Sequence, residues 1–277
     1  MSDVVVIVGV GGMGATIARR LAPGRTTVLA DYNEELLRGT CDSMRADGFD
    51  VVAQQVDVSS RESVHGLVEM VEQTGAMSTF VHTAGVSPTM ASLERVLAID
   101  LAGVAYTLEE FGEIVRPGTA GVVVSSMSSY LSRPFTREQE HAIRVSRGEE
   151  LLKLDFLSEA ALGNSGIGYG VAKLANRIQV QTASIAWGAR GARINAVSPG
   201  VISTGMGQQE LDSPSGAFMQ AMVDNSGTGR LGTSSDIADA VTYLVGPQAS
   251  FITGIDLLVD GGAIAAVQSG KVPMPTA

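Results

Sequence analysis

Tyr169 and Lys173 lie four positions apart at the start of a stretch, residues 169–187, whose apolar residues recur with helical spacing. Residues at i and i+4 share one face of a helix, so the phenol and the ammonium can point into one pocket. A nearby cation stabilises a phenolate and lowers the phenol pKa from its usual ~10. A tyrosine in this setting can exchange a proton with an alcohol or a carbonyl. The alternative is a buried tyrosine beside a solvated lysine, and the rest of the chain must decide.

A second group of residues near the N-terminus has the spacing of a phosphate-binding loop. Residues 4–8 form a β-branched run that predicts a buried strand, and residues 15–21 predict a helix. The glycines between them form G-x-G-x-x-G in the strand-to-helix context that this motif requires. Glycines allow a pyrophosphate to approach the backbone, and the helix N-terminus supplies N–H donors; the alternative is a glycine-rich turn without a ligand. The expected phosphate-binding residues are Gly9, Gly11, Gly12, Met13 and Gly14.

An acidic residue ends the second predicted strand, residues 26–30. Asp31 lies 17 positions after Gly14, near the place where a carboxylate accepts hydrogen bonds from adenosine ribose hydroxyls. A carboxylate there repels a 2′-phosphate, and the glycine loop contains no Arg or Lys. We therefore expect NAD rather than NADP, with Asp31 and Tyr32 at its adenosine end. The alternative role for Asp31 is the N-cap of the next helix.

The elements that must position these residues alternate along the chain. Further strands are predicted at residues 51–56, 79–82, 121–124, 193–197 and 256–259, and helices at 59–73, 93–114 and 234–244. This alternation predicts an α/β fold, with one doubly wound, Rossmann-like parallel sheet of about seven strands and helices on both faces. We expect one domain over residues 1–265 and a C-terminal tail over 266–277, with 271–277 poorly ordered. Residues 208–225 are expected to be mobile.

Residues 131–168 interrupt the alternation. Polar clusters and apolar residues with helical spacing predict one or two amphipathic helices that end near residues 163–166. This insertion is either a wall or lid of a substrate pocket, or a surface or subunit-contact elaboration. His141 falls within it, where a solvated helix face explains it best.

Composition limits the classes of protein that the chain can be. Of 277 residues, 45% are hydrophobic and 17% are charged, which indicates a well-filled core. A net charge of -10 argues against nucleic acid or an anionic membrane as a partner. Cys41 is the single cysteine, no stretch has signal-peptide or membrane-spanning character, and the three histidines lack zinc-ligand spacing. We expect a cytoplasmic protein with no disulfide and no metal site.

Several further motifs occur in a fixed order. They are the glycine loop, Asp57-Val58, Thr83-Ala84-Gly85, Ser125-Ser126, Tyr169-x-x-x-Lys173, Arg-Ile-Asn-Ala-Val-Ser-Pro-Gly at 193–200, Ile252-Thr253-Gly254 and Val259-Asp260-Gly261-Gly262. As a set, they make the chain from residue 4 to residue 262 resemble the classical short-chain dehydrogenase/reductase family. The resemblance implies a single Rossmann-like domain that binds a nicotinamide dinucleotide and assembles as a homo-oligomer, a tetramer or a dimer.

The resemblance also implies roles for individual residues. Tyr169 is the acid/base, Lys173 holds the nicotinamide ribose and lowers the Tyr169 pKa, and Ser126 hydrogen-bonds the substrate oxygen. A strand-terminal turn is the alternative role of Ser126, and Ser125, Ser128 and Ser129 are weaker candidates. The other residues implied to bind the cofactor are Asp57 and Val58 beside the adenine, Thr83, Ala84 and Gly85, and Pro199, Gly200, Ile202 and Thr204 near the nicotinamide.

The chain departs from the family pattern in several places. The glycine loop is one residue shorter than usual, and His82 stands where the family has Asn before Thr83-Ala84-Gly85. Asp100 aligns with the Asn that completes the family's proton relay, so its charge would change the electrostatics of the site. The connection from Ser126 to Tyr169 is longer than usual.

Two functions of different classes remain open. The first is an NAD-dependent oxidoreductase that interconverts a secondary alcohol and a ketone through Ser126, Tyr169, Lys173 and Asp100. Low aromatic content and the apolar insertion favour a hydrophobic, steroid-like small-molecule substrate. The second is an NAD-binding sensor or scaffold of the same fold with impaired catalysis, and Asp100 is the one feature that favours it.

Overall fold

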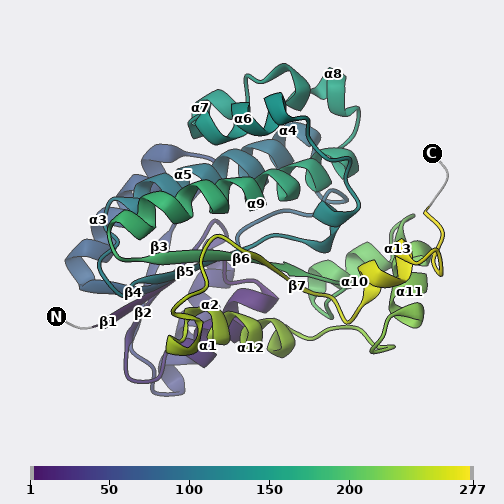
Figure 1. The fold of residues 1–277 in the computed structure, drawn as a ribbon. Helices are drawn as coiled ribbons and strands as arrows, with labels where there is room; N and C mark the ends of the chain where they lie inside the picture. Colours follow the sequence, from purple (N-terminus) through teal and green to yellow (C-terminus); the bar gives the residue numbers. More distant parts are fainter. Residues whose placement is uncertain (1–2, 275–277) are drawn as a thin grey trace.

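The protein, described over residues 3–274 by a computed structural model, is built on one sheet of seven parallel strands (Figure 1). The strand order is β3-β2-β1-β4-β5-β6-β7, so the winding direction reverses between β1 and β4. In such sheets, ligands bind at the carboxyl ends of the strands beside this reversal. The prediction of a doubly wound, Rossmann-like sheet is confirmed. The strands are β1 (Asp3–Val8), β2 (Thr26–Asp31), β3 (Val51–Gln55), β4 (Ala76–His82), β5 (Ala120–Val124), β6 (Arg193–Pro199) and β7 (Asp256–Val259).

Helices cover both faces of the sheet, with α1, α2 and α12 on one face and α3, α5 and α9 on the other (Figure 1). The α-helices are α1 (Gly12–Leu21), α2 (Glu34–Ala46), α3 (Arg61–Thr74), α4 (Leu93–Val96), α5 (Gly103–Gly112), α6 (Arg137–Val145), α7 (Gly148–Leu151), α8 (Glu159–Leu162), α9 (Ser165–Ala189), α10 (Gly205–Leu211), α11 (Gly216–Asn225), α12 (Ser234–Val245) and α13 (Ala263–Gln268). A π-helical segment, η1 (Leu97–Ala102), joins α4 to α5, and the short 3-10 helices are η2 (Met127–Tyr130), η3 (Asp155–Leu157) and η4 (Pro247–Ala249). Among residues 3–274, no helix combines the length and apolarity needed to cross a bilayer.

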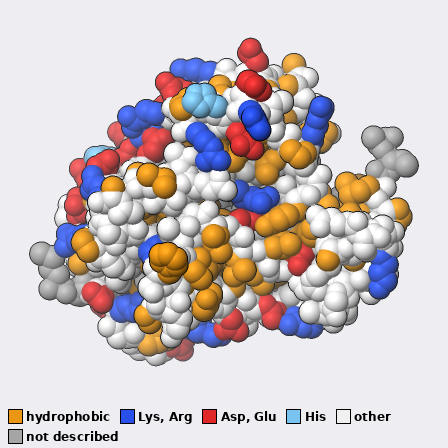
Figure 2. Space-filling view, viewed as in Figure 1, with side chains coloured by type: hydrophobic (Ala, Val, Ile, Leu, Met, Phe, Trp, Pro, Cys, Tyr) orange, Lys and Arg blue, Asp and Glu red, His pale blue; other side chains and the backbone are white. Residues whose placement is uncertain are grey.

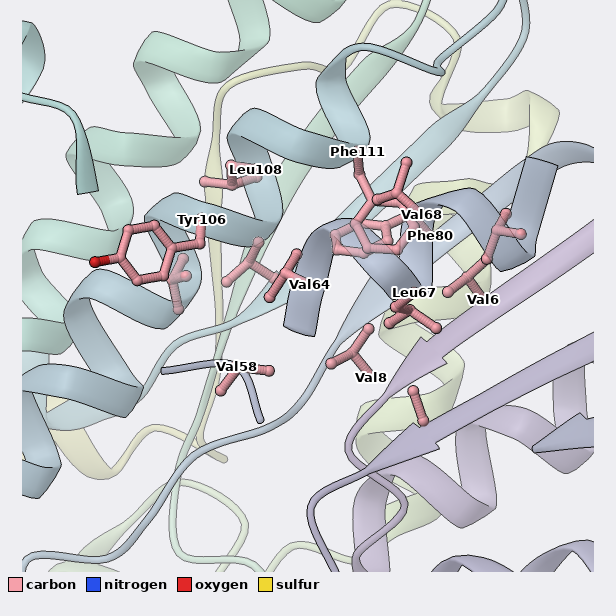
Figure 3. Packing of buried hydrophobic residues seen from close by; sticks show 14 of the residues in the cluster. Val6, Val8, Val58, Val64, Leu67, Val68, Phe80, Tyr106, Leu108 and Phe111 are labelled. Atoms are coloured by element: carbon pink, nitrogen blue, oxygen red, sulfur yellow. The ribbon is translucent and has the colours of Figure 1, made fainter. Parts of the chain in front are cut away.

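The sheet has a packed hydrophobic core on each face. Val6 and Val8 of β1 contribute to the core under α3, α5 and α9, where the Phe80 and Phe111 rings lie 4.6 Å apart (Figure 3). Ile7 of the same strand contributes to the opposite core. Successive strand residues point to opposite faces, so a strand buried on both sides must be apolar throughout. This is why the uninterrupted run at residues 4–8 predicts a central strand.

The insertion, residues 131–168, forms an extra layer outside α5 and α9 (Figure 1). Its buried side chains Ile143, Leu151, Leu157 and Leu162 pack against the outer sides of η1, α5 and α9. Figure 2 shows side chains of both charge signs interspersed over this layer. Instead of the one or two helices expected, the insertion contains α6 and three shorter segments, α7, η3 and α8.

Arg61 of α3 connects the insertion to the main domain. Its guanidinium forms ion pairs with Glu109, with Glu110 at 2.7 Å and with Glu149 of α7 at 2.6 Å. The cation thus joins three helices at the outer edge of the molecule.

Two expectations about the C-terminal third are wrong. Residues 208–225 were expected to be mobile, but α10 and α11 form there; Phe218 and Met222 of α11 pack in a cluster with Ile264 and Val267 of α13. The helix of residues 234–244 was expected to be the last, but α13 follows it and Val272 beyond α13 is buried. Packing between these short helices stabilises them, and the local sequence does not show that packing. Residues 275–277 of the expected tail lie outside the described residues.

Candidate active site

The glycine loop lies between the ends of β1 and β4. Gly9 has φ +93°, and a Cβ there would lie 2.5 Å from the backbone nitrogen of Ala84. Thr83 Oγ1 donates a hydrogen bond of 2.7 Å to the Gly9 carbonyl. Gly11 is the N-cap of α1, and no side chain there bonds the first N–H groups of the helix. Uncapped donors at a helix N-terminus beside a tightly held glycine turn fit an anionic pyrophosphate.

Asp31 holds this loop from the end of β2. Its Oδ2 accepts a hydrogen bond from the Val10 N–H at 2.8 Å, and its Oδ1 accepts one from the Asn33 N–H at 2.8 Å. Asn33, not Asp31, is the N-cap of α2, because its side chain accepts from the Leu36 N–H. Each Asp31 oxygen keeps a second lone pair, so the carboxylate can still accept a ribose hydroxyl.

The other residues expected near the cofactor follow the same carboxyl edge of the sheet. Asp57 and Val58 follow β3, Pro199 ends β6, and the Gly200 N–H donates to the Val259 carbonyl of β7 at 2.9 Å. Thr204 is the N-cap of α10 and lies against the glycine loop, since a Cβ at Gly12 would be 3.0 Å from its Cγ2.

Tyr169 and Lys173 occupy the N-terminal part of α9. The helix begins at Ser165, four residues earlier than expected, because Asn164 caps it through the Ile167 N–H. The Lys173 Nζ lies 5.4 Å from the centre of the Tyr169 ring. Tyr169 is half-buried, whereas Lys173 is only 4% exposed. The predicted i, i+4 pair therefore lies on one face.

The serines that follow β5 have separate environments. Ser126 is extended and caps η2 through the Ser128 N–H at 3.2 Å, and its side chain also interacts with the Tyr169 phenol. Ser125 instead donates its hydroxyl hydrogen to the Lys173 carbonyl at 2.9 Å and anchors α9 to the strand. Ser126 is thus both a turn residue and a neighbour of the phenol.

Asp100 is the direct partner of Lys173. Its Oδ1 lies 2.9 Å from the Lys173 Nζ, and its side chain is fully buried. Its Oδ2 accepts a hydrogen bond from the Val86 N–H at 3.2 Å. Burial works against the ammonium, but the nearby anionic groups, Asp100 first, outweigh it and raise the Lys173 pKa. Burial raises the Asp100 pKa, and Lys173 opposes that shift.

The effect of this arrangement on Tyr169 differs from expectation. Lys173 lowers the phenol pKa, as expected, but the net pKa of Tyr169 is raised. Burial is the largest cause, and the carboxylates of Asp100 and Glu210 act in the same direction. Lys173 and Ser126 lower the pKa without overcoming them. A cation four residues away is therefore not sufficient evidence of a lowered pKa when the phenol is buried and carboxylates lie near the cation.

Glu210 is a site residue that the sequence did not indicate. It lies on α10, is partly buried, and its Oε1 accepts a hydrogen bond from the buried Ser87 Oγ at 2.8 Å. Burial raises the Glu210 pKa, whereas the hydrogen bond from Ser87 and the charge of Lys173 act to lower it. The contact ties α10 to the loop after β4. Glu210 lies within residues 208–225, and no motif in that segment marks it as a site residue.

A groove elsewhere on the molecule contains none of the predicted site residues. Its volume is about 470 Å³, and it lies between α5, α6 and the C-terminal half of α9. Gln179, Trp187 and Arg190 line it, well beyond Lys173 along α9. The geometry of the acid/base pair, not the size of this groove, identifies the candidate active site. Among residues 3–274, no three His, Cys, Asp or Glu side chains are grouped so that they could hold a metal ion.

The chain matches models of known protein families over most of its length. A family model described as short chain dehydrogenase matches residues 3–138, and one described as Enoyl-(Acyl carrier protein) reductase matches residues 135–263. The structure is similar to the crystal structure of levodione reductase, with a TM-score of 0.75, 25% identity, and coverage of 95% of this chain and 98% of that chain.

Two curated relatives cover nearly the full chain. The 3beta-hydroxysteroid dehydrogenase 2 of Eggerthella lenta is 27% identical over 92% of this chain and 91% of that protein. Short-chain dehydrogenase/reductase bsc3 of Alternaria brassicicola is 38% identical over 262 residues, 94% of this chain and 95% of that protein. With this identity and with family matches in both halves, the chain belongs to the classical short-chain dehydrogenase/reductase family.

Proposed function

We propose that the protein is an NAD-dependent oxidoreductase that interconverts a secondary alcohol and a ketone. The observation that carries this proposal is the placement of Tyr169 beside Lys173 and Ser126, at the carboxyl edge of the sheet that also holds the glycine loop. A proton-transfer group and a dinucleotide cradle at one edge suit a hydride transfer coupled to a proton transfer.

The proposed chemistry assigns a separate task to each side chain. A bound nicotinamide would supply a hydride to the carbonyl carbon, or accept one from the alcohol carbon. In reduction Tyr169 donates its phenol proton to the substrate oxygen, so the carbonyl becomes an alcohol while the nicotinamide is oxidised. In oxidation the phenolate takes the alcohol proton. Ser126 hydrogen-bonds the same oxygen and fixes its position, and Lys173 holds the nicotinamide ribose.

Asp31 supports NAD as the cofactor. Its carboxylate is fixed by the backbone N–H groups of Val10 and Asn33, so it cannot move away from an incoming adenosine ribose without losing both bonds. A fixed anion accepts ribose hydroxyls and repels a 2′-phosphate.

A hydrophobic secondary alcohol or ketone, steroid-like in size, is the proposed substrate class. Two relatives from Eggerthella lenta are named 3beta-hydroxysteroid dehydrogenases, and each matches more than nine-tenths of this chain. Their names give the class with which a substrate screen should begin.

The test is a panel of secondary alcohols and ketones with NAD and NADP, followed by the absorbance of the reduced nicotinamide. On a confirmed substrate, Tyr169→Phe should lower turnover by roughly 10²- to 10⁴-fold, because it removes the proton donor and keeps the ring. NAD affinity should stay within a few-fold of wild type. Near-normal turnover of Tyr169→Phe would refute the assignment, and a preference for NADP would refute the role of Asp31.

A further inference from the structure

The charge partner of Lys173 is the feature of the site with the greatest chemical consequence. The Asp100 carboxylate and the Lys173 ammonium are 2.9 Å apart, and both side chains are almost completely buried. A Cβ at Gly85 would lie 2.5 Å from Asp100 Oδ1 and 3.4 Å from Lys173 Nζ, so the backbone closes directly over the pair. The Val86 N–H fixes the other carboxylate oxygen. The carboxylate is thus held in place from η1, α9 and the loop after β4.

We propose that Asp100 is a positioning residue whose carboxylate neutralises Lys173, so that Tyr169 stays protonated at neutral pH and acts as a proton donor to a carbonyl. The proposal deepens, and rests on, the oxidoreductase function proposed above. It assigns a direction to the chemistry at neutral pH: ketone reduction is favoured kinetically, and alcohol oxidation becomes fast only in alkali.

The charges around the phenol support this assignment. Lys173 on α9 is the cation that acts on Tyr169, and the anions are Asp100 on η1 and Glu210 on α10. His82 at the end of β4 also faces Lys173, but burial first and the Lys173 charge second lower its pKa to about 3, so it is neutral. The one cation near the phenol therefore faces two carboxyl groups, and a phenolate would place a further negative charge beside them. An isolated lysine would instead favour the phenolate.

The surroundings of Asp100 stabilise the ionised form of its buried side chain. Asp100 lies in a π-helical segment, and such segments are rare and concentrate at functional sites. For two buried charges, a close partner of opposite charge and further hydrogen bonds offset the cost of leaving water, which burial otherwise expresses as a raised Asp100 pKa. Lys173 and the Val86 N–H provide these to Asp100, and Asp100 provides the partner to Lys173.

The two directions of the reaction need different protonation states of Tyr169. Reduction uses the phenol, and the resulting phenolate regains a proton from solvent. Oxidation uses the phenolate. Lys173 and Asp100 do not change the equilibrium between alcohol and ketone, because an enzyme affects only rates. They set the pH at which Tyr169 changes from donor to acceptor.

The experiment titrates Tyr169 without substrate or cofactor. The tyrosinate absorbance of the full-length protein is followed against pH, and the curve of Tyr169→Phe is subtracted to isolate Tyr169. In wild type the midpoint should lie above the ~10 of an unperturbed tyrosine. In Asp100→Asn, which has the family's usual side chain at this position, it should fall by about one pH unit or more, because Lys173 loses its counter-ion.

Two further variants complete the test. Glu210→Gln should lower the midpoint in the same direction by a smaller amount, because Glu210 is less buried than Asp100. Asp42→Asn, an exposed carboxylate on α2, should leave it unchanged. An unchanged or higher midpoint in Asp100→Asn would overturn the proposal. A wild-type midpoint below ~10 would overturn it as well, and that measurement needs only the folded Tyr169→Phe variant for the subtraction and no folded Asp100 variant.

Activity gives an independent reading of the same proposal. With a confirmed ketone substrate, the alkaline limb of kcat/KM for reduction should move to lower pH in Asp100→Asn by the shift seen in the titration. If no substrate is turned over, the oxidoreductase function fails while the titration still decides the role of Asp100. If turnover is normal but the limb does not move, the role of Asp100 fails and the function stands.

Discussion

Gly11 and Gly14 belong to one loop but have different surroundings. A Cβ at Gly11 would meet no atom within 4 Å, and its φ of -60° suits any residue. A Cβ at Gly14 would lie 1.9 Å from the Gly9 carbonyl oxygen. Gly14 is therefore required by the fold itself, whereas Gly11 is required only if a ligand approaches the backbone.

Gly11→Ala separates these two requirements. We expect its Tm to equal that of wild type and its affinity for NAD to fall about tenfold, equivalent to ~1.4 kcal/mol. Gly14→Ala should lose both stability and NAD affinity. Thermal unfolding and a fluorescence titration with NAD measure the two effects. Wild-type NAD affinity in Gly11→Ala would mean that the loop is a turn without a ligand.

From residue spacing alone, the contacts within the site could be predicted only where the partners are local in sequence. Tyr169 and Lys173 are one helical turn apart, and the spacing alone places them together. Asp100 meets Lys173 from 73 positions away, and Glu210 meets Ser87 across 123 positions. No local pattern encodes such contacts, so the direction of the Tyr169 pKa shift could not be deduced before the elements were placed.

At the scale of elements, prediction succeeded where burial is continuous and failed where short helices depend on neighbours. The strand at residues 4–8 is apolar on both faces, so its pattern is unambiguous. By contrast, α10 has seven residues, too few to be stable alone. The Thr204 cap and the Glu210–Ser87 hydrogen bond support it, and neither is visible as periodicity.

The insertion has two parts with different expected roles. The helices α6 and α7 pack on the outer sides of α5 and α9, and Glu149 ties α7 to Arg61 at 2.6 Å. The end of the insertion is different, because Ser165 Oγ donates a hydrogen bond of 2.8 Å to the Pro88 carbonyl. Pro88 follows Ser87, the partner of Glu210, so this end lies beside the loop that borders the site.

We expect Ser165→Ala to change substrate choice and Glu149→Gln to leave it unchanged. A lost hydrogen bond of ~1 kcal/mol loosens the loop and should alter the ratio of kcat/KM for bulky and small secondary alcohols by up to about fivefold. The NAD affinity of both variants should match wild type. If Ser165→Ala and wild type had equal substrate profiles, the insertion would have no role in substrate choice.

At the scale of the whole molecule, the sheet was predictable because each motif follows a strand at the same edge. The carboxyl ends of β1, β2, β4, β5 and β6 bring together residues that are far apart in sequence. Because these residues converge, several polar side chains are buried near the carboxyl edge of the sheet. His82 at the end of β4 is one of them, with its Nδ1 3.3 Å from Thr107 Oγ1.

His82 should make the stability of the molecule depend on pH. Burial, and then the charge of Lys173, lower its pKa from 6.5 to about 3 in the folded protein. Between these values the unfolded chain binds a proton that the folded chain does not, so the free energy of unfolding falls as the pH falls. From pH ~7 to ~5 this histidine should cost about 2 kcal/mol.

The measurement is urea unfolding at these two pH values for wild type and His82→Asn. The variant lacks the buried proton-binding group, so its stability should fall by about 2 kcal/mol less than that of wild type over the same interval. His65→Asn is the matched comparison with the opposite sign. The hydrogen bond to Glu110 raises the His65 pKa, so His65 adds stability below its pKa that is lost as the pH rises. Its removal should therefore steepen the loss of stability in acid. If His82→Asn and wild type lost equal stability between the two pH values, His82 would not be the neutral, buried group that the Lys173 environment requires.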